Sequence, residues 1–341
     1  MFPPITTNVS THASTTPPTS PSFPTTASRY LTYRPRWPEF AQGDHNGRVT
    51  RLARDHWQRR IAALDPETEY AEIARMLSAH EFPWDTLQAL SFALFRTYAV
   101  PSIGDLLHDT GEFTKRVQKR YDDTGLLLEQ ILEHGLPSAP GTAAVRRINQ
   151  MHGHYPISND DFRYVLSTFV VVPVRWIAEH GYRPLTDHEQ RALTNYYRHL
   201  GRHMAIKDIP ETYREFERLL DDYEAAHFSY SAKARRVADA TLDLMTTFPP
   251  NRYAPAAVAK RFAYALMDDA LLDAFDYRRP RRWERRVART ALRARARFLA
   301  RRPAREQPLY VRDMGYYRTY PQGFEVGDLG TFPAEGSAQI R

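Results

Sequence analysis

The feature that most constrains this chain is a strongly apolar helix that begins after Ser158. Residues 158–161 read Ser-Asn-Asp-Asp, which places a helix-capping residue before acids that suit the positive end of the helix dipole. From there to Trp176 the helix is apolar on nearly all sides, as expected of a helix surrounded by others. Pro173 cannot donate to the Phe169 carbonyl, so we expect a kink at this point.

Apolar residues recur at helical spacing from Gly47 onward, and no alternating strand pattern or fixed-period repeat is found. Thr186 and Glu189 have the spacing of a capping box, which starts another helix. Helices are expected at residues 51–64, 66–79, 85–100, 113–133, 142–152, 158–176, 186–203, 210–228, 233–247, 255–275 and 283–300. The pattern predicts an all-α fold with about ten helices in one domain.

The two ends of the chain differ in composition from this helical region. Residues 1–28 are rich in Thr, Ser and Pro and are expected to be disordered, because they bury too little surface to offset their ordering entropy. We expect residues 29–46 to form an extended arm, residues 47–305 the helical domain, and residues 306–341 an irregular C-terminal tail. The sequence shows no signal peptide and no apolar run long enough to span a bilayer, so the expected location is cytoplasmic.

The absence of cysteine removes several kinds of active site. Disulfides, iron–sulfur clusters, zinc–thiolate sites, thiol catalysis and thiolate-ligated haem are all excluded. The sequence also has no Walker loop, no dinucleotide-binding glycine motif and no nucleophile elbow. A metal or cofactor held by histidine remains, and the chain has 13 His.

Two histidine pairings suggest a non-haem metal site. His199 and His203 are four residues apart and share a helix face, but no Glu completes a zinc-protease motif, which favours polar or supporting roles. Glu224 and His227 form one Glu-x-x-His motif. A four-helix di-iron site needs two such motifs and two further carboxylates, so the sequence gives it little support.

His152 and His154 lie where one helix ends, just before the strongly apolar helix begins. An imidazole at the rim of an apolar cavity, fixed by packed helices, suits a haem ligand. On spacing alone, either histidine could equally be structural.

Five sequence blocks carry a resemblance to a known family; they read FALFRTYAVPSI, TGEF, KRYDDT, RRINQMHGHYPISNDDFRYVLSTFVVVPVRWI and GRHMAIKDIPET. Over residues 82–228 the chain resembles the MpaB-type oxygenases and, more distantly, the latex clearing proteins that cleave rubber. The resemblance implies a globin-like helical core that holds a non-covalent haem b. The implied reaction is the oxidative cleavage, by O2, of a carbon–carbon double bond in an apolar or isoprenoid substrate.

The resemblance also implies roles for individual residues. The family's proximal haem histidine lies in the pattern Arg-x-Asn-x-x-His, which Arg147, Asn149 and His152 match here. His152 is therefore the expected ligand of the haem iron, with Arg147 and Asn149 as cofactor-binding residues. His154, outside the pattern, is the alternative ligand.

The rubber-cleaving relatives keep an Arg and a Thr four residues apart near the haem, and Arg120 and Thr124 match this spacing on one helix face. The guanidinium could pair with a haem propionate or stabilise bound oxygen, and the hydroxyl could donate a hydrogen bond. The alternative for Arg120 is a surface ion pair with Asp123 or another acid. Those relatives have Lys where this chain has Asp123, which argues against rubber as the substrate, and their catalytic Glu has no assigned counterpart here.

These observations predict a haem b-dependent oxygenase. Two alternatives remain: a haem-binding carrier or sensor without turnover, which would use the same His152, and a helical protein with a non-haem metal.

The net charge of +7 comes from one segment. Residues 278–305 contain 13 Arg and one acid, so this segment carries +12 and the rest of the chain −5. The helix from Trp283 to Ala300 is expected either to be a solvated outer helix or to touch an anionic membrane peripherally. Charge confined to one helix, without a recognised binding fold, does not predict a nucleic-acid partner.

Overall fold

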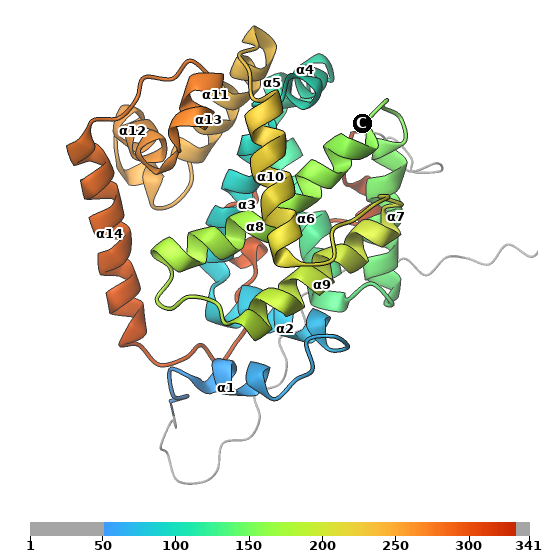
Figure 1. The fold of residues 1–341 in the computed structure, drawn as a ribbon, viewed down its shortest axis with the longest axis vertical. Helices are drawn as coiled ribbons and strands as arrows, with labels where there is room; N and C mark the ends of the chain where they lie inside the picture. The colour runs from blue at the N-terminus through green and yellow to red at the C-terminus, as the bar shows by residue number, and fades with distance from the viewer. Residues whose placement is uncertain (1–50, 332–341) are drawn as a thin grey trace, which may run out of the picture. The chain divides into compact units, whose positions relative to one another are not determined.

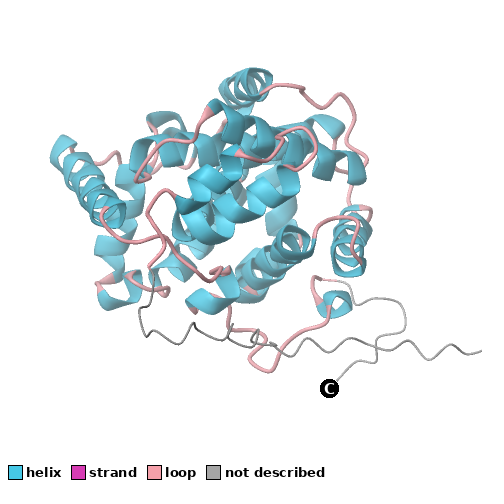
Figure 2. Cartoon of the chain, turned by 90° about the horizontal axis from the view of Figure 1, so that it is seen from below, coloured by secondary structure: helices cyan, strands magenta, loops and turns pink. Residues whose placement is uncertain are grey.

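The computed structural model describes residues 51–331, which contain fourteen α-helices and no strand (Figures 1 and 2). The prediction of an all-α fold is confirmed, although helices are more numerous than the ten expected. The segments predicted as disordered, at 1–28, and as an extended arm, at 29–46, lie outside the described residues.

The helix predicted to be central is α8 (Asn159–His180), which packs against α3 (Pro83–Thr97), α9 (Asp187–His203) and α10 (Tyr213–His227) (Figure 1). The Ser158 side chain caps it by accepting a hydrogen bond from the Asp161 amide at 3.0 Å. Twelve of its residues are buried, as expected for a helix covered on several sides. The helix continues past Pro173 to His180, further than the predicted end at Trp176.

The other helices are α1 (His56–Ala62), α2 (Tyr70–Met76), α4 (Pro101–Asp109), α5 (Glu112–Lys115), α6 (Val117–His134), α7 (Ala139–His152), α11 (Ala232–Thr246), α12 (Ala256–Leu266), α13 (Asp269–Ala274) and α14 (Arg282–Ala300). The predicted capping box at the start of α9 is confirmed: the Thr186 side chain accepts from the Glu189 amide, and the Glu189 carboxylate accepts from the Thr186 amide.

The extra helices have local causes. Pro101 was expected to end a helix, but it occupies the first turn of α4, where proline is favoured because its missing amide would have no partner. The single helix expected at residues 255–275 is divided into α12 and α13. Met267 is extended there, and the Asp268 side chain caps α13 by accepting from the Leu271 amide at 2.9 Å.

We call residues 306–331, the described part of the C-terminal tail, the tail segment. It is irregular apart from two short 3-10 turns at Val311–Met314 and Val326–Asp328. It contacts α6 and α7, so it packs on the helical domain.

Candidate functional site

A cavity of about 800 Å³ lies among the helices and is lined mainly by apolar side chains, including Leu90, Leu94, Leu128, Val165 and Phe169. This volume is within the range of ligand-binding sites, roughly 300–1,000 Å³. The lining comes mainly from α3, α4, α6, α7, α8 and α9, with further residues from α10, α11 and the tail segment.

His152, the last residue of α7, lies in the wall of this cavity. Its ring packs against Phe162, with ring centroids 5.3 Å apart, and its Nδ1 atom is buried without a hydrogen-bond partner. Burial, helped by the positive charge of Arg120, lowers the pKa of His152 to about 4. The imidazole is therefore neutral near pH 7, which is the form that binds a metal ion.

Arg120 and Thr124 of α6 line the same cavity. Arg120 Nη1 donates to Thr124 Oγ1 at 3.0 Å, and Thr124 Oγ1 donates to the Arg120 carbonyl at 2.9 Å. Within residues 51–331, Arg120 forms no ion pair, and the carboxylate of Asp123 instead pairs with Lys119 at 2.7 Å. The structure thus brings Arg120, Thr124 and His152 to one cavity.

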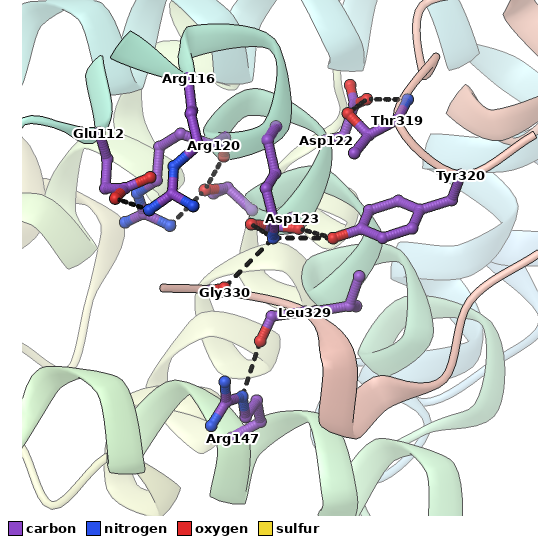
Figure 3. A network of polar contacts seen from close by, with 12 residues as sticks. Glu112, Arg116, Arg120, Asp122, Asp123, Arg147, Thr319, Tyr320, Leu329 and Gly330 are labelled. Atoms are coloured by element: carbon purple, nitrogen blue, oxygen red, sulfur yellow. Dashed lines mark hydrogen bonds and ion pairs between the residues drawn. The ribbon is translucent and has the colours of Figure 1, made fainter. Parts of the chain in front are cut away.

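The other predicted site residues lie outside the lining of this cavity. Arg147 is buried and donates from Nε to the Leu329 carbonyl at 2.7 Å, which ties α7 to the tail segment (Figure 3). Asn149 donates to the His203 carbonyl at 2.8 Å. His154 is exposed, and its Nδ1 atom is 2.7 Å from the Gln150 carbonyl.

Acidic side chains of α6 hold the tail segment in place (Figure 3). Asp122 is fully buried and accepts hydrogen bonds from the Arg318 amide at 3.0 Å and from the Thr319 amide at 2.8 Å. Asp123, also buried, accepts from the Tyr320 hydroxyl and from Lys119, whose ammonium also donates to the Gly330 carbonyl at 3.2 Å.

Further along α6, Glu129 accepts from the Val311 amide at 2.6 Å and pairs with Arg312 at 2.8 Å. Burial raises the pKa of Glu129 to about 7, although the Arg312 charge opposes this rise. As a result, the tail segment contributes Leu309, Val311 and Tyr317 to the cavity wall.

Neither Glu129 nor this part of the wall was predicted from the sequence. The one signal available was that Asp122, Glu129 and Glu133 recur at spacings of seven and four residues, which places three acids on one face of α6. The tail supplies one matching basic side chain, Arg312, which pairs with Glu129 and Glu133, whereas Arg318 bonds Asp122 only through its backbone amide.

The two non-haem alternatives gain no support from the geometry. His199 and His203 face each other, with their Nε2 atoms 3.2 Å apart, but neither lines the cavity. Glu224 is buried, pairs with Arg96 and accepts from the Tyr164 hydroxyl at 3.2 Å. Across the described residues, no group of three or more His, Asp or Glu side chains is placed to hold a metal ion.

None of the helices within residues 51–331 has the length and apolar character needed to cross a membrane.

Comparison with known proteins gives a consistent set of relatives. Residues 84–298 match the family model described as "ER-bound oxygenase mpaB/B'/Rubber oxygenase, catalytic domain". The chain is 29% identical over 290 residues to the ER-bound oxygenase mpaB of Penicillium roqueforti (strain FM164), covering 76% of this chain and 97% of that protein.

Two proteins of Penicillium brevicompactum are also similar. The ER-bound oxygenase mpaB' is 32% identical over 227 residues, which cover 61% of this chain and 53% of the relative. The ER-bound oxygenase mpaB is 32% identical over 199 residues, which cover 53% of this chain and 50% of the relative. The match therefore spans about half the length of these two relatives.

Proposed function

This chain belongs to the family of mpaB-type and rubber oxygenases, and on that premise we propose that it is a haem b-dependent oxygenase acting on an apolar substrate. The observation that carries the haem proposal is the state of His152. Its imidazole is neutral, its buried Nδ1 atom has no hydrogen-bond partner, and it stands in the wall of an apolar cavity of about 800 Å³. These properties fit a residue that would bind the iron of a non-covalent haem.

Each residue of the cavity would have a distinct part. His152 would hold the iron, and the bound haem would supply the activation of O2. Arg120 would pair through its guanidinium with a haem propionate or stabilise negative charge in the cavity, and Thr124 would offer its hydroxyl as a hydrogen-bond donor. Arg147 and Asn149 would keep α7, and with it His152, in position through their bonds to the Leu329 and His203 carbonyls.

The lining of the cavity favours an apolar substrate. Its aliphatic and aromatic side chains would bind a hydrocarbon chain and exclude water from the reacting bond. We therefore propose an isoprenoid-like substrate whose carbon–carbon double bond is cleaved oxidatively.

Haem content is the direct test of this proposal. Protein purified from iron-replete cells should show a Soret band, and a pyridine haemochrome assay should identify haem b at about one per chain. Consumption of O2 with an alkene substrate would separate an oxygenase from a carrier or sensor. Protein that takes up no haem and instead contains zinc or two iron ions would contradict the proposal.

Arg120→Ala and Thr124→Ala should each lower turnover per haem by about 10–100-fold, because each removes a polar group that acts on the bound ligands. Unfolding free energies should change by about 1 kcal/mol or less, because neither residue makes a buried ion pair within the described chain. Thr124→Ser should retain activity because it keeps the hydroxyl.

Arg116→Ala is the matched control for these two variants. Arg116 precedes α6 and pairs with Glu112, and its side chain is 57% exposed. Its removal should leave turnover unchanged. Full turnover in Arg120→Ala would instead show that this arginine has only a structural role.

A further inference from the structure

The basic helix α14 lies at the edge of the helical domain and packs with one face against α12 and α8 (Figure 1). Its buried residues are Glu284, Ala288, Leu292 and Ala296, which recur every fourth position and so form a single stripe. Two of the four, Ala288 and Ala296, are small, which lets the helix lie close to its neighbours. The opposite side of α14 faces away from this packing.

Large apolar side chains are exposed on that opposite side. Trp283 and Val287 are each 56% exposed, and Phe298 is 58% exposed. Their separations of four and eleven residues place them along one side of the helix, about one and three turns apart. Half the surface of three large apolar residues on one helix is thus left in contact with water.

A row of arginines runs beside this apolar row. Arg282, Arg286, Arg289, Arg293 and Arg297 recur every three or four residues, and all are exposed. Arg289 pairs with Glu179 at 3.1 Å. No ion pair involves the other four within the described part of the chain, so their charges are not neutralised locally.

We propose that this exposed face of α14 is a docking surface for an anionic lipid membrane. An apolar row beside a cationic row is the arrangement of a helix that lies in the plane of a membrane interface, with its apolar side chains among the acyl chains. Arginines attract anionic headgroups, and Trp is favoured at the level of the headgroups.

The same features weigh against two other partners. A nucleic acid would use the arginines but would leave Val287 and Phe298 without a role. A second copy of the chain would bring two rows of arginines together, and like charges in close contact are unfavourable. An anionic membrane would bind both rows, the arginines through its headgroups and the apolar side chains through its acyl chains.

Co-sedimentation of the full chain with lipid vesicles tests the proposal. Vesicles of phosphatidylcholine with about one third phosphatidylglycerol should bind the protein at low salt and release it at high salt, because exposed charges are screened over about 10 Å at 0.1 M. Vesicles of phosphatidylcholine alone should bind it at least about ten-fold more weakly.

Two variants separate the contributions of the two rows. Combined Arg286→Glu, Arg293→Glu and Arg297→Glu should weaken binding to the anionic vesicles by about 100-fold or more. Combined Trp283→Ala and Phe298→Ala should weaken it by about ten-fold while leaving the charge unchanged. Circular dichroism should show both variants folded, since the substituted side chains lie on the exposed side.

The matched control carries the same charge change elsewhere: Arg202→Glu, Arg218→Glu and Arg236→Glu, at exposed arginines of α9, α10 and α11 without ion pairs in the described structure. Its vesicle binding should remain within a few-fold of the unmodified chain. Three results would overturn the proposal: no binding to anionic vesicles at low salt, equal loss of binding in the control, or binding to duplex RNA that is tighter than to vesicles and unaffected by Trp283→Ala with Phe298→Ala.

Discussion

Replacing His152 with alanine should reduce haem content from about one per chain to almost none and abolish oxygenase activity. The reason is that a non-covalent haem in an apolar cavity depends on one protein bond to its iron, and His152 is the histidine of α7 that lies in the cavity wall with an unpartnered ring nitrogen. The loss should be visible as the disappearance of the Soret band. Added imidazole should restore part of the band, because the alanine variant leaves room for a free ligand.

His154→Ala is the matched control, since this residue lies two positions further on and is exposed. It should keep its haem, as should His199→Ala and His203→Ala, whose side chains do not line the cavity. Should His154→Ala alone empty the site, the ligand would be His154. Should His152→Ala and His154→Ala both keep the haem, the iron would be held by a residue other than these two.

Replacing Asp122 with alanine should lower the free energy of unfolding by about 3 kcal/mol or more and release the tail segment from α6. Asp122 is completely buried and accepts hydrogen bonds from the Arg318 and Thr319 amides and from Gln118 at 2.6 Å. Without the carboxylate, the Arg318 and Thr319 amides would lose their acceptor, and Gln118 would keep only its bond to the Tyr316 carbonyl. Tyr317, which directly precedes Arg318 in the tail, would then leave the cavity wall.

Chemical denaturation measures the stability change, and limited proteolysis reports whether the tail is released. Asp221→Ala is the control, because its carboxylate is 53% exposed and pairs with Arg175 at the surface. It should cost about 1 kcal/mol or less and leave the tail protected. A stable Asp122→Ala variant with a protected tail would show that the apolar contacts of the tail suffice to hold it.

The fold class and several helix starts could be predicted from the sequence because their causes are local. The cap at Ser158 and the capping box at Thr186 are short motifs, and the structure confirms both. The start of α4 at Pro101 was not predicted, because proline can either end a helix or occupy its first turn, and the choice depends on the residues around it. The number of helices was therefore underestimated.

The candidate site could be predicted only in part. Spacing alone places Arg120 and Thr124 on one helix face, but α6 and α7 had to be packed together before His152 reached the same cavity, and the family resemblance supplied that connection. The contact of Asp122 with residues almost 200 positions later has no local signal at all. Long-range hydrogen bonds of this kind follow from packing rather than from sequence pattern.

The position of the tail segment in the cavity wall also has a consequence for the order of events during synthesis. Leu309, Val311 and Tyr317 follow all fourteen helices in the chain, so the ribosome makes them last among the segments that surround the cavity. Were the helices to pack before the tail is made, the cavity would be open on the side that Leu309, Val311 and Tyr317 cover in the finished chain. A large, rigid ligand could then enter the cavity through that open side. The tail segment would afterwards cover the ligand and retain it.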